Sequence, residues 1–442
     1  MDSRRSFLQC ALAFGAGALS LSRLAEAESV KHKPKNLSTV RLEAEQSHSL
    51  MPPVPVVTPD VPKLPYTMDG NVKVFHLVAE PVKRELMPGR MIDVWGYNGT
   101  CPGPTIEANQ GDRVRIVLDN HLPEPTTMHW HGLEIPNHMD GMPYISQKPI
   151  APGGRFVYEF ELHQNGTFFY HSHGAMQEMM GMLGMFILHP QHAYQPRVDH
   201  DFGILLQEWA LLPNNSIPNT TSMEFNWLTF NGKAGPATMP VVVPLDSRVR
   251  IRLVNLGMDH HPIHLHGHTF EVTGTEGGRK PPTTWDPGNT VLVGVAQARD
   301  IEFVANNPGD WMIHCHLPHH MMNSMMDLLS DRPISTSPLS QKQADEQMPM
   351  TMTPGQTMTM TDMRTSAKIA SNAERVPGFP QDGFMDMSMD EAGGHAPEFM
   401  ELPPNWSVGM QGMMTLLRVM PPEKYQRYLS AKEKAQPSGG AQ

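Results

Sequence analysis

An internal repeat between residues 95 and 326 constrains the fold of this chain more than any other feature. Four segments recur in the same order at offsets of 133 to 143 residues. They are Asn98-Gly99 with Asn231-Gly232, Arg113–Asn120 with Arg248–Asn255, His129–Gly132 with His264–Gly267, and Gly166–His173 with Gly309–His316. Because order and spacing are both preserved, the sequence predicts a duplicated domain of about 130 residues.

Apolar residues alternate with polar ones within each copy, as in Val114, Ile116 and Leu118 of the first. Such runs, bounded by Gly, Pro and Asn, are typical of short antiparallel strands. With 36 Gly, 42 Pro and only 18% charged residues, the composition excludes a helical bundle and a coiled coil. We therefore predict an all-β chain with two β-sandwich domains, over residues 71–195 and 196–332.

The N-terminus has the features of an export signal. Arg4-Arg5 precede a short apolar stretch and a small-residue cleavage site at residues 25–27. The paired arginines indicate a twin-arginine-type signal peptide over residues 1–27, with an ordinary secretory signal as the alternative. Residues 28–70 are expected to form a proline-rich linker. We therefore expect a periplasmic or otherwise extracytoplasmic protein without a membrane span in its mature chain.

The C-terminal part of the chain, residues 333–442, loses hydrophobic periodicity and becomes rich in Met, Pro, Ser and Thr. We expect a Met/Pro-rich, largely disordered tail, ending in short helices that begin near Trp406 and dock on the body. The net charge of −11, with no basic block, excludes a nucleic-acid partner.

Four His-x-His pairs occur at matching positions of the two repeats: His129/His131, His171/His173, His264/His266 and His314/His316. Side chains alternate along a strand, so each pair sends both imidazoles to one face. One such pair usually marks a polar strand face, but four at equivalent positions predict a shared site. Eight imidazoles exceed what one tetrahedral ion accepts, so several metal ions are expected.

Cys315 lies between His314 and His316 and must point to the opposite face of the strand. There, His261, His320 and Met325 would complete the Cys, two His and weak axial Met of a blue-copper site. Three of the four ligands are absent at the equivalent first-repeat positions, which hold Thr126, Ser172, Gln177 and Met182. The sequence therefore places a mononuclear copper in the second repeat alone, with a bonded electron route from Cys315 through His314 and His316.

These motifs resemble those of the multicopper oxidases of the laccase type. The resemblance covers residues 70 to 330 and implies two cupredoxin-like Greek-key domains, four copper ions, and reduction of O2 to water. It assigns the ligands as follows: type 1 copper to His261, Cys315, His320 and Met325; type 2 copper to His129 and His264; the type 3 pair to His131, His171 and His316 for one ion and His173, His266 and His314 for the other.

Two departures from the familiar pattern matter. Only 87 residues separate His173 from His261, which leaves no room for a middle domain. The chain is therefore similar to the two-domain oxidases, which implies a homotrimer with the cluster between subunits.

The second departure concerns the proton supply for O2 reduction. Met321 stands where many relatives have a carboxylate, and Asp140 matches another acid that the family uses. Asp140 is either a catalytic proton-transfer residue or the first residue of an Asp140-Gly141 turn.

Three functions are weighed. We favour an oxidase for Cu(I) or another reduced metal ion, serving copper tolerance, because methionines also cluster between Met176 and Met185. There they could fill the core or bind Cu(I). A laccase acting on phenols or aromatic amines is the second function. A non-catalytic periplasmic copper-binding protein is the third, and the ten ligand histidines argue against it.

Overall fold

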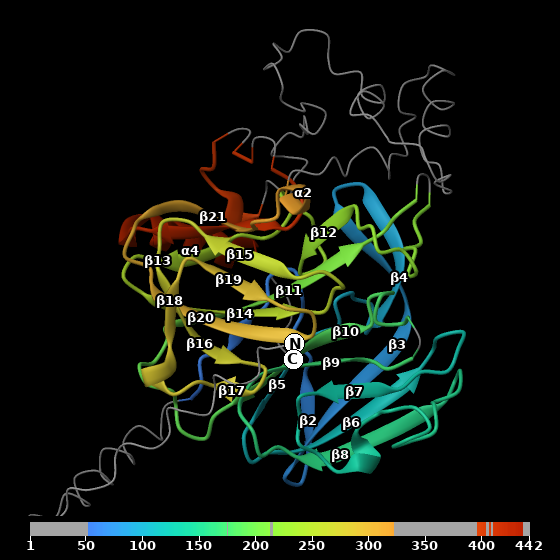
Figure 1. Ribbon diagram of the computed structural model, residues 1–442. Coiled ribbons are helices and arrows are strands. Elements are labelled where there is room, and N and C mark those ends of the chain that lie inside the picture. Colours follow the sequence, from blue (N-terminus) through green and yellow to red (C-terminus); the bar gives the residue numbers. More distant parts are fainter. Residues whose placement is uncertain are drawn as a thin grey trace, which may run out of the picture. The chain divides into compact units, whose positions relative to one another are not determined.

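The computed structural model describes residues 52–174, 176–212, 215–321, 396–403, 406–407 and 410–435. These residues are almost entirely β-structure, in four sheets, which confirms the all-β prediction (Figure 1). Among them, no helix has the length and apolarity needed to cross a bilayer.

The first sandwich consists of two sheets that share one hydrophobic core. One sheet has the order β2-β3-β6-β8 with β4 beside β3: β2 Tyr66–Asp69, β3 Val72–Met87, β6 Arg113–Asn120, β8 Arg155–Glu161 and β4 Arg90–Tyr97. The other has the order β5-β10-β9-β7: β5 Ile106–Asn109, β10 Leu183–His189, β9 Gly166–Ser172 and β7 Met128–His131. A single 3-10 turn, η1 Asn137–Met139, follows β7.

The second sandwich also has two sheets around one core. The larger sheet has the order β1-β11-β14-β20-β16-β17, with β12 beside β11 and β18 beside β16: β1 Val56–Val57, β11 His200–Trp209, β14 Arg248–Asn255, β20 Gln297–Val304, β16 Phe270–Thr275, β17 Gly278–Arg279, β12 Trp227–Phe230 and β18 Asp286–Gly288. The smaller has the order β13-β22-β21-β15-β19: β13 Val241–Pro244, β22 Met414–Met420, β21 Gly309–Cys315, β15 His261–Leu265 and β19 Thr290–Val293. Short helical segments are η2 Pro282–Thr284, α2 Pro318–Met321 and η5 Pro397–Phe399, and α4 Pro422–Ala435 is longer.

The two smaller sheets have the same topology, as the repeat requires. In the first, β10 runs parallel to β5 and antiparallel to β9, which pairs with β7. In the second, β22 runs parallel to β13 and antiparallel to β21, which pairs with β15. Strand β22 is therefore the counterpart of β10, and it completes the second sandwich from the far end of the chain.

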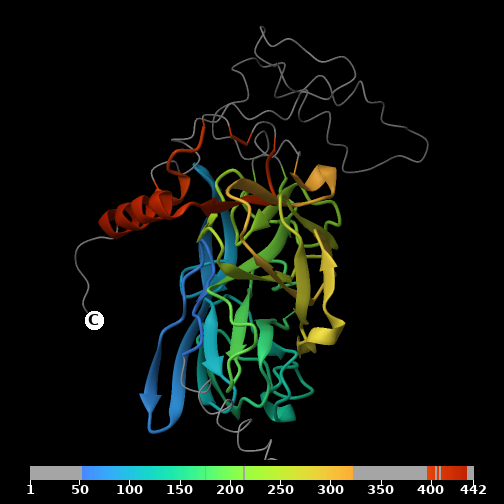
Figure 2. The ribbon, with the colours of Figure 1, turned by 90° about the vertical axis from the view of Figure 1, so that its left-hand side faces the viewer.

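This strand corrects the expectation of short helices from Trp406 onward. All seven residues of β22 are buried, and among the described residues from Trp406 onward only α4, after Pro421, is helical. A continuous apolar run fits a buried strand or a short helix equally well, and here the gap between β13 and β21 decides for the strand. Tyr428 of α4 then packs against Val242 and Met420. Figure 2 shows α4 as the long red helix that follows β22 in the chain.

The expected linker over residues 28–70 also needs correction where the structure describes it. Val56–Val57 pair with β11, and Tyr66–Asp69 pair with β3. Both are edge strands, where proline is tolerated because one row of backbone groups has no ladder partner. The signal peptide predicted over residues 1–27 lies outside the described residues.

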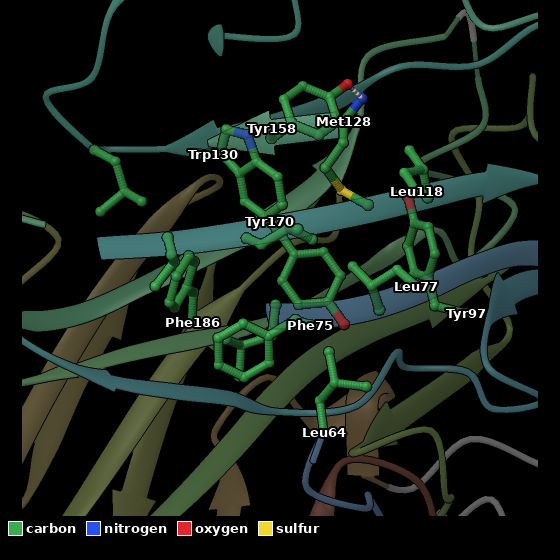
Figure 3. Packing of buried hydrophobic residues seen from close by; sticks show 14 of the residues in the cluster. Leu64, Phe75, Leu77, Tyr97, Leu118, Met128, Trp130, Tyr158, Tyr170 and Phe186 are labelled. Carbon is green, nitrogen blue, oxygen red and sulfur yellow. Dashed lines mark hydrogen bonds between the residues drawn. The ribbon is translucent and has the colours of Figure 1, made fainter. Parts of the chain in front are cut away.

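Aromatic packing fixes strand β7 in the first core. Trp130 is fully buried and packs edge-on against Tyr158 and Phe186 (Figure 3). It makes the same kind of contact with Phe160. The backbone N–H of Met128 donates to the Tyr158 hydroxyl at 3.0 Å. Because Trp130 points into the core, its neighbours on β7 must point to the other face of the sheet.

A buried polar network joins the two sandwiches within the chain. Arg252 of β14 binds both carboxylate oxygens of Asp201 at 2.8 Å and donates to Thr167 Oγ1 of β9 at 2.7 Å. Thr167 in turn donates to Asp300 at 2.6 Å. Buried charges are stable only when paired in this way, so the network holds β9 against the second sandwich.

Candidate metal centres

The histidines of the first repeat form one group on neighbouring strands. Strands β7 and β9 lie side by side (Figure 1), and their register pairs His129 directly with His171. Ring contacts join His129 to His131, His171 and His173 at centroid distances of 5.3 to 5.7 Å. His131 Nδ1 lies 3.4 Å from His171 Nε2.

The histidines of the second repeat form a matching group. Register pairs His264 of β15 with His314 of β21. Rings of His264, His266, His314 and His316 contact one another at 4.8 to 5.5 Å. His266 Nε2 lies 3.0 Å from His314 Nε2. Two nitrogen ligands of one tetrahedral ion lie about 3.3 Å apart, so both groups are spaced to hold metal.

Backbone carbonyls set the tautomer of four of these rings. Nδ1 lies 2.8 to 2.9 Å from a carbonyl oxygen in each: His129 with Asp140, His171 with Ser172, His264 with Asn289, and His314 with Cys315. A carbonyl oxygen only accepts, so Nδ1 carries the proton and Nε2 keeps its lone pair for a metal.

A third group lies inside the second sandwich. His261 Nδ1 and His320 Nδ1 are 3.2 Å apart, and Cys315 Sγ is 3.8 Å from the first and 3.5 Å from the second. All three side chains are buried. One sulfur and two nitrogens at these distances match a soft or borderline transition metal bound by Cys and two His.

Burial lowers the pKa of several of these histidines. It lowers the pKa of His131, His314 and His320 to about 4 each, so these rings are neutral at neutral pH. His171 differs: burial alone would lower its pKa, but the neighbouring Glu178 carboxylate raises it above its ordinary value. Neutral imidazoles are the form that binds a metal ion.

Comparison with known proteins identifies the family of this chain. Two multicopper oxidase family models match residues 80–193 and 211–333. The chain belongs to the multicopper oxidases. These enzymes are oxidoreductases, and the donor set of imidazoles and one thiolate fits the copper that the family implies.

Individual relatives of this multicopper oxidase include copper resistance protein A of Pseudomonas syringae pv. tomato, 34% identical over 32% of this chain and 24% of the relative. Laccase-1 of Botryotinia fuckeliana is 35% identical over 48% of this chain and 39% of its own. The chain thus matches well under half the length of these relatives. The blue copper oxidase of Nitrosomonas europaea superposes with a TM-score of 0.54 and 30% identity, covering 58% of this chain and 82% of that one.

Two carboxylates that the sequence motifs do not include border the Cys315 group of the oxidase. Glu208 of β11 is buried, and its Oε2 lies 2.8 Å from His261 Nε2. Glu208 also accepts the backbone N–H of Asp259 at 2.6 Å. Burial would raise the pKa of Glu208, but His261 and the backbone N–H groups of Asp259 and Met258 lower it below its ordinary value. Asp259 lies 3.7 Å from His320 Nε2, with its own side chain 41% exposed.

The first repeat replaces the Cys315 group with hydrogen bonds between neutral side chains. Thr126 Oγ1 and Ser172 Oγ both donate to Gln177 Oε1, at 2.7 and 2.6 Å. These residues occupy the positions equivalent to His261, Cys315 and His320. Their hydrogen-bonding groups satisfy one another, so this buried position needs no ion.

A methionine that the sequence analysis missed lies beside the Cys315 group. Met413 is fully buried in the same core cluster as Cys315. Its carbonyl accepts the Cys315 N–H at 3.0 Å, and its N–H donates to the His320 carbonyl at 3.0 Å. Met182 makes the same two bonds in the first repeat, with Ser172 at 2.9 Å and Gln177 at 3.3 Å. The shared Gly-Met pair before the last strand, at Gly181 and Gly412, is the signal that could have found it. Met325 lies outside the described residues.

Asp140 lies against His129 and also begins a turn. Its Oδ1 lies 3.4 Å from His129 Nδ1, and its carbonyl accepts from the same nitrogen. It also begins a turn, because Gly141 has φ +85° and a Cβ there would lie 1.7 Å from the Met128 carbonyl oxygen. The turn holds Asp140 against His129 and permits no other residue at Gly141.

Proposed function

We propose that this multicopper oxidase couples four one-electron oxidations of a reduced metal ion, with Cu(I) favoured, to the reduction of O2 to water, and that it serves copper tolerance. Bound copper supplies the electron transfer and the oxygen chemistry. The protein supplies the ligands, their protonation states and the route between them.

Strand β21 is the observation that carries this proposal. Cys315 points into the second sandwich, whereas His314 packs with His264 and His266 on the other face. One strand therefore joins the buried Cys315 group to the histidine group through consecutive residues. An electron that enters at Cys315 has a covalent route to the site of oxygen reduction.

The proposed ligands follow from these groups. His261, Cys315 and His320 would hold type 1 copper, with the thioether of Met325 or Met413 as a further, weak donor. The other eight histidines hold the remaining copper: His129 and His264 type 2, His131, His171 and His316 one type 3 ion, and His173, His266 and His314 the other. Asp140 is proposed as the acid near type 2 copper.

Two residues at the type 1 site support a metal-ion substrate. Met258 is 41% exposed and directly precedes Asp259, the carboxylate beside His320. A thioether and a carboxylate at the surface suit a soft cation better than a neutral phenol. The similarity to a copper resistance protein agrees with this choice, while the similarity to a laccase keeps phenols as the second candidate.

Oxygen consumption with Cu(I) and with a phenol, measured on wild type and on Met258→Leu, tests the substrate. We expect Met258→Leu to lower kcat/KM for Cu(I) and leave the phenol reaction unchanged. Met68→Leu, on the exposed strand β2, is the matched control. Equal loss with both substrates would favour a general structural effect, and no oxygen uptake with either would favour the non-catalytic copper-binding protein.

We also propose a homotrimer in which the first-repeat group of one subunit meets the second-repeat group of another. Among the described residues, ring contacts join members of each histidine group and none joins the two groups. His173, His266 and His316 are exposed in the single chain. A partner subunit would bury them and complete the cluster. A monomer with its full copper complement, found by light scattering, would exclude this arrangement.

We place the protein in the periplasm, exported through the twin-arginine signal predicted at Arg4-Arg5. Replacing both arginines by lysine should leave the copper protein in the cytoplasm, as cell fractionation would detect.

A further inference from the structure

An acidic residue beside the first histidine group, Glu178, has an apolar counterpart beside the second. The backbone bonds of Met182 and Met413 make Gln177 the counterpart of His320. The next residue in each repeat is therefore equivalent, and these residues are Glu178 and Met321. An acidic side chain thus occupies in the first repeat a position that is apolar in the second.

Glu178 reaches a proposed copper ligand. Its Oε2 lies 3.1 Å from His171 Nδ1, and the side chains are 33% and 9% exposed. The other nitrogen of His171, Nε2, faces His131 Nδ1 at 3.4 Å. The carboxylate therefore lies behind the ring, on the side away from the neighbouring ligand.

The equivalent ring in the second repeat, His314, has one acceptor for its Nδ1 among the described residues, whereas His171 has two. His314 Nδ1 lies 2.8 Å from its own backbone acceptor, the Cys315 carbonyl, as His171 Nδ1 lies 2.9 Å from that of Ser172. Glu178 adds a charged acceptor to His171 alone. Its turn is held in place by the Gly181 N–H, which donates to the Glu178 carbonyl at 2.9 Å.

We infer that Glu178 is a positioning residue for the oxygen-reducing cluster: it fixes the His171 ring with Nε2 toward copper and makes that nitrogen a stronger donor. A carboxylate behind a metal-bound imidazole orients the ring and raises its basicity. The two ions of the type 3 pair would then be unequal, because no carboxylate among the described residues pairs with His314. This inference rests on the proposed copper function.

Three variants of the full-length protein test it. Glu178→Ala removes the acceptor and its charge, Glu178→Gln removes only the charge, and Glu178→Asp keeps the charge on a shorter side chain. Glu161→Ala, on strand β8 and paired with Arg113, is the matched control. Competition with a copper chelator measures the cluster affinity, EPR detects Cu(II) that is not magnetically coupled, and visible absorption reports the type 1 site.

We expect Glu178→Ala to weaken copper binding in the cluster by about 10- to 100-fold and to decouple the type 3 pair, with unchanged type 1 absorption. Glu178→Gln and Glu178→Asp should lose less. Cluster affinity and EPR equal to those of Glu161→Ala would overturn the inference. Equal losses in all three Glu178 variants would also overturn it, because the turn and not the carboxylate would then be responsible. If wild type itself binds no copper in the cluster, the proposed function fails instead.

Discussion

At the scale of single residues, the proposed type 1 site depends on a carboxylate behind one of its proposed ligands. Glu208 binds His261 Nε2, with both side chains fully buried, and also accepts the backbone N–H of Asp259. Nδ1 of His261 is therefore left free to face Cys315 and His320. A buried carboxylate stays charged only with such partners, so Glu208 and His261 depend on each other.

Replacing Glu208 by Gln should raise the reduction potential of type 1 copper. The carboxylate charge stabilises the oxidised ion, and its loss favours the reduced one. We expect oxidase activity to fall by about 10- to 100-fold. A spectroelectrochemical titration measures the potential, with Glu271→Gln on the exposed side of β16 as control. An unchanged or lower potential would contradict this role.

Met413 and Met325 are competing candidates for the axial position of type 1 copper. We expect Met413→Leu to change the type 1 absorption spectrum and raise the potential, because a weak sulfur donor is lost. Met325→Leu should change neither. The sequence aligned the axial position with Met182, and the backbone bonds make Met413 the counterpart of Met182. The reverse outcome would return the axial role to Met325.

At the scale of elements, strand β22 matters most. It fills the gap between β13 and β21, and β21 carries Cys315. Without it, two strands of this sheet would expose unpaired backbone groups and the Cys315 group would lose its cover. The chain between His320 and Met413 is therefore an insertion within the second sandwich and not a terminal tail.

Two shortened chains test whether this part of the chain is an insertion within the second sandwich or a dispensable terminal tail. A chain ending at residue 410 lacks β22 and should yield no folded, blue protein. An internal deletion of residues 328–394, bridged by a short Gly/Ser linker, should stay folded, because the Gln411 N–H already donates to the Met321 carbonyl at 2.7 Å.

If the deleted methionines supply Cu(I), the internal deletion should lower Cu(I) oxidation several-fold and spare phenol oxidation. Visible absorption and oxygen uptake measure both effects. Blue, active protein from the chain ending at 410 would refute the role of β22.

The sequence predicted the repeat-based part of the fold well and missed what lies outside the repeat. His-x-His periodicity and matched spacing were enough to predict which side chains lie together in the three proposed ligand groups. Strand β22 was not predicted because a long insertion separates it from Cys315, whereas β10 follows Ser172 after only a short turn. The role of Glu208 was not predicted because Glu208 lies on a continuous buried strand and contacts His261 across the sandwich. No local sequence pattern marks such a contact.

At the scale of the whole molecule, buried ion pairs stabilise the larger sheet of the second sandwich. Glu302 of β20 has no exposed surface and pairs with Arg248, Arg250 and Arg279. Burial would raise the pKa of Glu302, but these guanidinium groups lower it to about 2. Its stabilisation is therefore complete above the ordinary glutamate pKa and is lost as the pH falls toward about 2.

Glu302→Gln should destabilise the copper-free protein by about 3 kcal/mol at neutral pH, which is the free energy of a pKa shift of this size. The variant should also lose less stability than wild type between about pH 4.5 and pH 2, since it has no carboxylate to protonate. Urea unfolding across this range measures both. A constant difference at every pH would show that the ion pairs do not act through Glu302 ionisation.

The shared cluster is the central claim about the assembled molecule, and mixing two inactive variants tests it most directly. His131→Ala disables the first-repeat group, and His264→Ala disables the second-repeat group. If the cluster lies between subunits, co-producing both in one cell creates interfaces with two intact halves. Random assembly of a trimer predicts about one quarter of wild-type oxygen uptake. Each variant alone should be inactive, and a mixture as inactive as either variant alone would contradict the account.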